Sequence, residues 1–434
     1  MTPKRLLAAA QRFGTPLYAY DLDAAVARAR LLADLFGGRF GISYAIKANP
    51  NAALLRALRP QCTSFDASSF AEVRRGLAAG MPAQRLSFSG PAKRPAEIEA
   101  AVAAGVGELV VESLAEAQAA SAAASARGRR QPVLARLNPL TLPAGFAASM
   151  SVGPSQFGID EEAMSDVLPA MVALTGIELV GFHAYSGTNS LDAFAIAQNF
   201  GIFIDLFRRA QALCGIRPRA LVFGAGFGVP YLPADQPLDH DALPAMVNPM
   251  LDALRAEPAF ADAALTLELG RWLIGPAGWL LTSVVAAKHS RGVEIRACDA
   301  GFNNHLAACG MMGSVIKRHW RFANLSNPHG PPGRYMLVGP LCTTIDRLAA
   351  SIELPEVRVG DVLAIEQSGA YGLSASPVKF ISHPEPREAA WQGGAWHDVS
   401  ETLLNHWMAA PPDAPAEPDQ PGAPGSGPGP PAMP

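Results

Sequence analysis

Eight short β-like runs alternate with helical segments over roughly 250 residues, and this alternation constrains the fold more than any other feature of the chain. Apolar runs of this length predict buried strands, and apolar residues at helical spacing predict helices packed against them. The rhythm is that of an α/β fold, a (β/α)₈ TIM barrel, in which active sites lie at the C-terminal ends of the strands. The expected strands are 40–48, 63–67, 85–89, 108–112, 132–137, 178–184, 219–224 and 264–269. The expected helices include 69–79, 95–104, 113–126, 161–174 and 191–214.

After Arg271 the chain changes to strand-like runs with few helical segments, which predicts a second, mainly β domain. From residue 411 to 434, ten of 24 residues are proline, so this tail cannot bury enough apolar surface to fold. We predict a barrel domain at 25–275, a β-rich domain formed by 1–24 and 276–408, and a disordered tail at 409–434. The strands expected in the β-rich domain are 16–21, 279–288, 292–298, 335–337 and 362–366.

Composition excludes several classes of function. The chain has 35 Lys and Arg against 38 Asp and Glu and no long basic block, so we expect neither nucleic acid nor a membrane as a partner. The first 13 residues lack the apolar run of a signal peptide, and the expected location is the cytoplasm. The five cysteines are scattered without a C-x-x-C pair, which indicates neither a disulfide framework nor a metal site.

Lys47 is the first candidate for chemistry, because it ends the apolar run Ser43–Ile46 at the exit of the first expected strand. Burial there is expected to lower the pKa of the lysine, which leaves more neutral amine to attack a carbonyl as a Schiff-base lysine. Taken alone, the residue is more simply explained as a solvated surface charge, as most lysines are.

Other polar residues end strands on the same rim. His183 ends the sixth expected strand, the turn Gly224–Gly228 follows the seventh, and Glu268 and Arg271 follow the eighth. Each has a structural alternative, since a glycine run can be a tight turn and a histidine can be a hydrogen-bonded core residue. Together, a lysine, an acid and a glycine turn that can cradle a phosphate predict a pyridoxal phosphate pocket.

At these residues the chain resembles the fold-type III pyridoxal phosphate decarboxylases, the group of diaminopimelate, ornithine and arginine decarboxylases related to alanine racemase. The resemblance runs from Thr15 to about Pro377. The landmarks are Tyr44-Ala45-Ile46-Lys47-Ala48-Asn49, Gln156-Phe157-Gly158-Ile159, His183-Ala184-Tyr185-Ser186, the Gly224 turn, Glu268-Leu269-Gly270-Arg271, Asp299-Ala300-Gly301, Gly339-Pro340-Leu341-Cys342 and Gly369-Ala370-Tyr371-Gly372.

The resemblance implies a role for each matching position. Lys47 would carry the cofactor pyridoxal 5'-phosphate, His183 would stack on its ring, and Glu268 would pair with the ring nitrogen. Cys342 matches a catalytic cysteine that enters from the other subunit, which implies a homodimer with a shared active site. The residues expected to hold the phosphate, by side chain or backbone, are Ser186, Gly226, Phe227, Gly228, Gly270, Arg271 and Tyr371.

Departures from the family pattern bear on the substrate. The diaminopimelate and ornithine enzymes place an acid after the cysteine to bind the distal amine, whereas this chain has Thr343. A hydroxyl does not offset a buried ammonium, so a free distal amine is disfavoured. An arginine and a tyrosine of the diaminopimelate enzymes are replaced by Ala307 and Met311. The residues expected to face the substrate are Asp299, Asn303, Thr343 and Asp346.

The segments Asn303–Leu306 and Met311–His319 are similar to a branch of the family that acts on carrier-protein-bound or conjugated amino acids. The basic residues Lys317, Arg318 and Arg321 could meet a carrier phosphate or a substrate carboxylate, with a solvated basic surface as the alternative. We therefore expect an α-decarboxylase of an amino acid or its conjugate, in siderophore, antibiotic or other secondary-metabolite biosynthesis. A diaminopimelate decarboxylase, an amino-acid racemase or epimerase on the same scaffold, and a non-catalytic cofactor carrier remain as alternatives.

Overall fold

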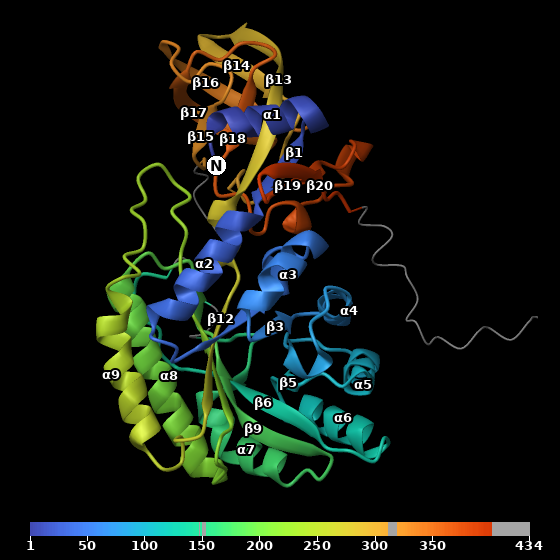
Figure 1. Ribbon diagram of the computed structural model, residues 1–434, viewed down its shortest axis with the longest axis vertical. Helices are drawn as coiled ribbons and strands as arrows, with labels where there is room; N and C mark the ends of the chain where they lie inside the picture. Colours follow the sequence, from blue (N-terminus) through green and yellow to red (C-terminus); the bar gives the residue numbers. More distant parts are fainter. Residues whose placement is uncertain (147, 150–152, 311–318, 402–434) are drawn as a thin grey trace, which may run out of the picture. The chain divides into compact units, whose positions relative to one another are not determined.

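The computed structural model describes residues 1–146, 148–149, 153–310 and 319–401. Within them, eight parallel strands close into a barrel in the order β5-β4-β3-β2-β12-β11-β9-β6, with β6 pairing back to β5 (Figure 1). This confirms the predicted TIM barrel, and each expected strand is present within a few residues of its predicted limits. The barrel strands are β2 (Gly41–Ala45), β3 (Ser64–Ala67), β4 (Leu86–Phe88), β5 (Glu108–Val111), β6 (Gln131–Asn138), β9 (Ile177–Ala184), β11 (Ala220–Gly224) and β12 (Ala264–Leu269).

Helices lie between successive barrel strands, and several begin at side-chain caps that the sequence encodes. Ser69 accepts a hydrogen bond from the backbone N–H of Glu72, whose carboxylate in turn accepts from Ser68 N; this reciprocal pattern fixes the start of α4. Ser113 and Glu116 repeat the pattern at α6. The helices are α2 (Leu22–Leu35), α3 (Ala52–Leu58), α4 (Phe70–Ala78), α5 (Pro95–Ala104), α6 (Leu114–Ser125), α7 (Met164–Val172), α8 (Ala193–Cys214), α9 (Leu243–Ala256) and the short α10 (Arg271–Ile274).

The remaining strands form a mixed sheet in the order β17-β16-β14-β13-β1-β19-β20, to which β18 and β15 are added through β13. Strands were expected at five of these positions, but β15, β17, β19 and β20 were not. The strands are β1 (Leu17–Asp21), β13 (Gly278–Ser290), β14 (Val293–Cys298), β15 (Phe322–Asn324), β16 (Pro332–Val338), β17 (Arg347–Pro355), β18 (Val362–Ile365), β19 (Arg387–Gln392) and β20 (Ala395–Asp398). Two-residue strands β7 (Ala148–Ser149), β8 (Ile159–Asp160) and β10 (Gly187–Thr188) border the barrel.

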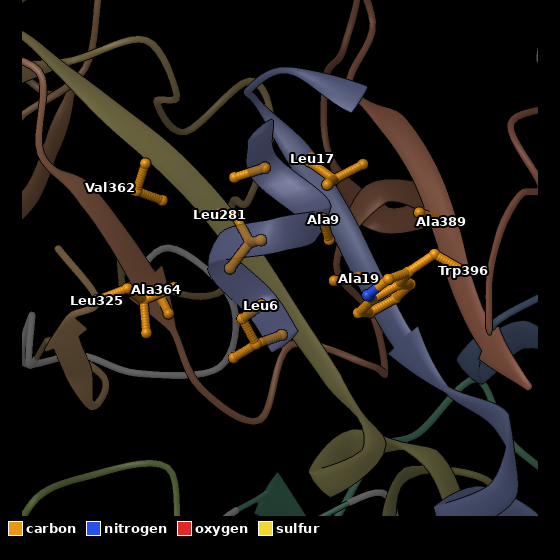
Figure 2. Close-up of a cluster of buried hydrophobic side chains, with 11 residues drawn as sticks. Leu6, Ala9, Leu17, Ala19, Leu281, Leu325, Val362, Ala364, Ala389 and Trp396 are labelled. Carbon is orange, nitrogen blue, oxygen red and sulfur yellow. The ribbon is translucent and has the colours of Figure 1, made fainter. Parts of the chain in front are cut away.

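Helix α1 (Pro3–Phe13) was not expected from the sequence and completes the core of this sheet. Leu6 and Ala9 of α1 pack against Leu17 and Ala19 of β1 (Figure 2). The Trp396 indole N–H also donates to the Arg5 carbonyl oxygen at 3.2 Å. The buried cluster comprises Leu6, Ala9, Ala10, Leu17, Ala19, Leu281, Leu325, Val362, Ala364, Ala389 and Trp396.

Residues 1–400 form one compact unit. We propose that the chain divides into a barrel domain (25–275) and a β-rich domain (1–24 and 276–408), of which residues 402–408 lie outside the described residues. The predicted disordered tail, 409–434, lies outside the described residues. Across the described residues, none of the helices combines the length and apolar content needed to span a membrane.

Candidate active site

Lys47 lies in a single helical turn, η1 (Ile46–Ala48), directly after strand β2. Its neighbours Ile46 and Ala48 are fully buried, whereas the Lys47 side chain is 40% exposed into the mouth of the barrel. Two hydrogen bonds fix the turn that follows: the Tyr44 hydroxyl donates to the Asn49 carbonyl at 3.0 Å, and Asn49 Nδ2 donates to the Gly369 carbonyl at 3.0 Å. The lysine is thus presented by rigid backbone at the C-terminal end of the strand, as expected.

Two carboxylates flank the amine of Lys47. Its Nζ lies 3.8 Å from Glu268 Oε1 and 3.8 Å from Asp66 Oδ2. Burial lowers the pKa of Lys47, but the attraction of Glu268 and Asp66 outweighs burial and raises the pKa above that of an ordinary lysine. The expectation of a lowered pKa is therefore wrong for this arrangement, because two acids from other strands, β12 and β3, converge on the amine.

Glu268 is held as a carboxylate by His183. His183 Nε2 donates to Glu268 Oε2 at 2.9 Å, and both side chains are buried. Burial alone would raise the pKa of Glu268, but the hydrogen bond and charge of His183, together with Lys47 and Arg136, lower it to about 2. The two predicted residues therefore meet next to Lys47, and the acid carries a negative charge at any working pH.

Arg271 provides a cation on the other side of the same pocket. It is partly buried; its Nη1 donates to the Tyr231 hydroxyl at 2.9 Å, and its guanidinium lies 4.5 Å from the centre of the Tyr371 ring. No carboxylate of the described chain pairs with it, and its Nε has no hydrogen-bond partner there. A guanidinium with unused donors and no acid partner is suited to an anion.

The glycine turn after β11 lies next to this cation. Gly226 has φ +64°, and a Cβ at this position would lie 2.7 Å from the Phe146 ring and 2.8 Å from the Gly187 carbonyl oxygen. Only glycine fits such a conformation and space, and the Gly226 backbone itself lines the pocket. The pocket is lined by Ala45, Lys47, Tyr185, Thr188, Gly226, Phe227, Glu268, Leu269, Gly270, Arg271, Trp272 and Tyr371.

Seven predicted site residues thus share one pocket, while others support it from behind. Ser186 is fully buried, and its hydroxyl donates to Asn199 Oδ1 at 2.7 Å. Gly228 N donates to the Ser190 carbonyl at 2.7 Å. Neither residue lines the pocket, and their predicted phosphate contacts stay predictions. Tyr185, Thr188 and Trp272 line the pocket and were not predicted to.

Tyr371 reaches the pocket from the segment that follows β18. Its backbone N donates to the Ala48 carbonyl at 2.8 Å, next to Lys47, and its φ of +53° is one that residues with side chains rarely adopt. Glycine follows it at position 372, where a Cβ would lie 2.6 Å from the Tyr18 ring. The β-rich domain therefore completes a pocket whose other walls come from the barrel.

Two of the four residues expected to face the substrate, Asp299 and Asp346, accept hydrogen bonds within the β-rich domain. Asp299 accepts hydrogen bonds from Thr282 and Thr15, at 2.6 Å and 2.5 Å. Asp346 accepts from Phe302 N and Leu341 N, each at 2.9 Å, and so fixes the loop before β17. Both carboxylates thus hold the local fold, and neither lines the Lys47 pocket within this chain, so their contact with a substrate stays a prediction.

The other expected substrate residues lie near these two. Thr343 directly follows Cys342, which is exposed on the loop between β16 and β17. Asn303 is fully buried, and its side-chain amide has no partner among the described residues. Neither Cys342 nor Thr343 lines the pocket of Lys47 within this chain.

The basic segment before β15 is only partly described. Lys317 and Arg318 lie outside the described residues. Arg321 does not form a solvated basic surface, because its Nε donates to the Leu232 carbonyl at 3.2 Å and its Nη2 to the Asp235 carbonyl at 2.9 Å. In this chain Arg321 holds a loop of the barrel.

Asp66 is the site residue that sequence reasoning missed. It is 1% exposed at the end of β3 and accepts hydrogen bonds from the hydroxyls of Ser87 and Ser89, both at 2.9 Å. Burial and repulsion from Glu268 raise the pKa of Asp66 to about 7, against the opposing effect of Lys47 and the serines. A signal was present, since Asp66 ends the second expected strand on the rim that carries Lys47.

Asp66→Asn is expected to raise the free energy of unfolding at about pH 8 by about 2 to 4 kcal/mol, since each unit of pKa change on folding contributes about 1.36 kcal/mol. Asparagine still accepts from a serine hydroxyl, but it removes a carboxylate whose pKa rises on folding from 3.8 to about 7. Such a group destabilises the folded state above the higher value. This loss of stability disappears as the pH falls to 3.8, the pKa in the unfolded chain, because the carboxyl is then protonated in both the folded and the unfolded state.

Urea unfolding at about pH 8 and about pH 4 measures this effect. The free energy of unfolding of Asp66→Asn should exceed that of the wild type at the higher pH and equal it at the lower pH. The matched control is Asp262→Asn, at a carboxylate that is 88% exposed, which should show no such pH dependence. Equal stability of wild type and Asp66→Asn at the higher pH would contradict the prediction.

Comparison with known proteins places this geometry among pyridoxal enzymes. Residues 22–275 match the family described as pyridoxal-dependent decarboxylase, pyridoxal binding domain. The chain is 30% identical over 395 residues to the L-glutamyl-[BtrI acyl-carrier protein] decarboxylase of Niallia circulans, covering 90% of this chain and 92% of that protein. It is 32% identical over 397 residues to the diaminopimelate decarboxylase of Methanothermobacter thermautotrophicus, covering 90% of each.

A solved structure agrees with the fold. The diaminopimelate decarboxylase of Helicobacter pylori, complexed with L-lysine, superimposes with a TM-score of 0.79 at 26% identity. The superposition covers 94% of this chain and 98% of that one. The likeness therefore includes both the barrel and the β-rich domain.

Proposed function

The chain belongs to the family of pyridoxal-dependent decarboxylases, and on this basis we propose that it removes the α-carboxylate of an amino acid whose far end is conjugated. Its general activity is that of a carboxy-lyase that uses pyridoxal 5'-phosphate. We assign it to siderophore, antibiotic or other secondary-metabolite biosynthesis, on the strength of its similarity to a decarboxylase of a carrier-protein-bound glutamyl group.

The observation that carries the proposal is that two positions at which the diaminopimelate enzymes place charged side chains are uncharged here. Thr343 follows the exposed Cys342, and Ala307 stands where the diaminopimelate enzymes place an arginine. An ammonium or carboxylate removed from water is costly unless an opposite charge meets it. A far end that is an amide or thioester carries no charge and needs no such partner.

The pocket residues fit the cofactor, and each has a task within the proposal. Lys47 holds the cofactor covalently, while Arg271, Tyr371 and the Gly226 turn bind its phosphate. Glu268, which stays ionised, keeps a proton on the ring nitrogen. When bound, the cofactor supplies an electron sink for the electron pair left behind by CO₂. Asp66 provides a second negative charge beside the amine of Lys47 whenever that amine is free.

The test is release of CO₂ from a panel of free, citrylated and carrier-loaded amino acids, followed by mass spectrometry for the loss of one CO₂. We expect turnover of a conjugated substrate and, for free amino acids, a kcat/KM lower by about 100-fold or more, as expected when a buried charge is left unpaired. If a free amino acid had a kcat/KM equal to or higher than that of every conjugated substrate, the proposal of a conjugated substrate would be rejected.

Diaminopimelate decarboxylation is the second candidate, because a relative with that name is 32% identical over 90% of both chains. Free meso-diaminopimelate in the same panel decides between the two. A racemase or epimerase would instead exchange the α-hydrogen with solvent and release no CO₂, so deuterium incorporation without CO₂ would exclude decarboxylation of that substrate.

We also propose that Cys342 acts in the active site of a second subunit. It is exposed and does not line the Lys47 pocket of its own chain, so in this proposal a homodimer supplies the proton donor. Cys342→Ala is expected to lower kcat by about 10²- to 10⁴-fold, the usual range for a lost general acid, with the cofactor still bound. Cys214→Ala, at a partly buried cysteine that ends α8, is the matched control and should retain full kcat.

Mixed dimers test the sharing of the site. When Lys47→Ala and Cys342→Ala subunits are unfolded together and refolded as an equal mixture, half of the dimers are mixed and each has one intact site, which restores about a quarter of wild-type activity. If each subunit uses its own cysteine, the mixture stays inactive.

A further inference from the structure

Arg271 is connected to the β-rich domain through two stacked aromatic rings. Its Nη1 donates to the Tyr231 hydroxyl at 2.9 Å. The Tyr231 ring stacks on Trp320, with the ring centroids 4.0 Å apart and the planes 23° from parallel. Both aromatic residues are buried, at 7% and 6% exposed. Tyr231 belongs to the barrel segment between β11 and α9, whereas Trp320 lies just before β15 of the β-rich domain.

The neighbouring Arg321 holds the loop that carries Tyr231. Its backbone N donates to the Tyr231 carbonyl at 3.1 Å, and its guanidinium donates to the carbonyls of Leu232 and Asp235. Arg321 is itself tied to the sheet, because the N–H of Glu366, which follows β18, donates to its carbonyl at 3.0 Å. The β-rich domain thus holds this barrel loop through several hydrogen bonds as well as through the ring stack.

The chemistry of this contact suits an anion site. A carboxylate beside Arg271 would orient the guanidinium but also neutralise it. The Tyr231 hydroxyl accepts one hydrogen bond and so orients the guanidinium without placing a carboxylate against its charge. Trp320 in turn restricts the phenol ring to one plane. The guanidinium is therefore directed before any anion arrives, which lowers the ordering cost of binding.

We propose that Tyr231 and Trp320 are positioning residues for Arg271, through which the β-rich domain sets the affinity of the barrel for the phosphate group of its cofactor. The proposal rests on the assignment of the phosphate to Arg271 in the proposed function. In this proposal the β-rich domain contributes to cofactor binding in two ways, through Tyr371 and through the positioning of Arg271.

Tyr231→Phe tests the hydrogen bond while the ring stack remains. In the full-length, cofactor-free protein, we expect the apparent Kd for pyridoxal 5'-phosphate to rise about 10- to 100-fold, as for loss of a hydrogen bond to a charged group. The Kd for pyridoxal, which lacks the phosphate, should stay unchanged. An equal loss for both ligands would mean general damage to the pocket and would overturn the proposal, as would no loss for either.

Two further variants separate positioning from folding. Trp320→Leu leaves Arg271 and Tyr231 intact, and we expect the ratio of the two Kd values to shift in the same direction by about 3- to 10-fold, the scale of a lost aromatic pair. Tyr335→Phe is the matched control: its hydroxyl is a buried acceptor for Val357 N, at 3.2 Å, and the ratio should not change. If the ratio of the two Kd values in Trp320→Leu equals that of the wild type, Trp320 does not position Arg271.

Failure of the proposed function would look different. Wild-type protein that binds pyridoxal and pyridoxal 5'-phosphate equally well, or neither, would reject the cofactor phosphate site itself. In that case the affinity for inorganic phosphate, measured by titration, tests directly whether Tyr231 positions Arg271. A weaker phosphate affinity in Tyr231→Phe than in wild type supports it, and equal affinities overturn it.

Discussion

Lys47→Ala is expected to abolish decarboxylation, lowering kcat/KM by more than about 10⁴-fold, a loss of the scale seen when a covalent nucleophile is removed. The cofactor should also lose its covalent attachment, because no other amine was found beside the Glu268 carboxylate within the described chain. Borohydride reduction followed by peptide mapping measures the attachment, and release of CO₂ measures the activity.

Lys47→Arg separates the chemistry of the amine from its charge. Arginine keeps a cation between Asp66 and Glu268, so the fold should be retained, but a guanidinium does not carry the cofactor covalently. Lys288→Ala, at an exposed position of β13, is a control that should leave the adduct unchanged. Recovery of the reduced adduct on a peptide from Lys47→Ala would show that the assigned lysine is wrong.

Glu268→Gln is the second substitution with a large expected effect, a loss of about 10²- to 10³-fold in kcat, typical of removing one preorganised electrostatic group. Glutamine matches the shape of Glu268 and can still bond His183, but it supplies no negative charge. The pKa of Glu268 is lowered to about 2, so the wild-type residue is ionised throughout the working range. Its contribution to stability is present above pH 4.5, its ordinary pKa, and is lost only as the pH falls through about 2.

The pH dependence of kcat checks this assignment. Wild-type kcat should show no titration of Glu268 above about pH 4, and Glu268→Gln should be slow at every pH. Glu353→Gln, at a side chain that is 67% exposed on β17, is the matched control with unchanged kcat. Near-normal kcat in Glu268→Gln would exclude the ring-nitrogen role.

The barrel could be predicted because its signals are local. Each strand is an apolar run bounded by turn residues, and each helix repeats apolar residues at its own period. Once the strands are numbered, Lys47, His183 and Glu268 must lie on one rim, since parallel strands carry their C-terminal ends to the same side. Their meeting in the structure is therefore a consequence of topology.

What could not be predicted depends on contacts between distant segments. The raised pKa of Lys47 comes from Asp66 and Glu268, which approach the amine through β3 and β12. Strands β19 and β20 are short, and β19 is placed in the sheet by its pairing with β1 and β20. Arg321 resembles a free surface charge in sequence, and only the fold shows that it binds the carbonyls of Leu232 and Asp235.

Strand β1 lies between β13, which it meets antiparallel, and β19, which it meets in parallel. During synthesis β1 is made before both of its partners, because Leu17 pairs with Leu281 on one edge and with Arg387 on the other. The barrel strands, complete at Leu269, can close before β19 has been translated. Strand β1 therefore stays without β19 while the barrel is being made, and β19 is the later of its two partners to be synthesised.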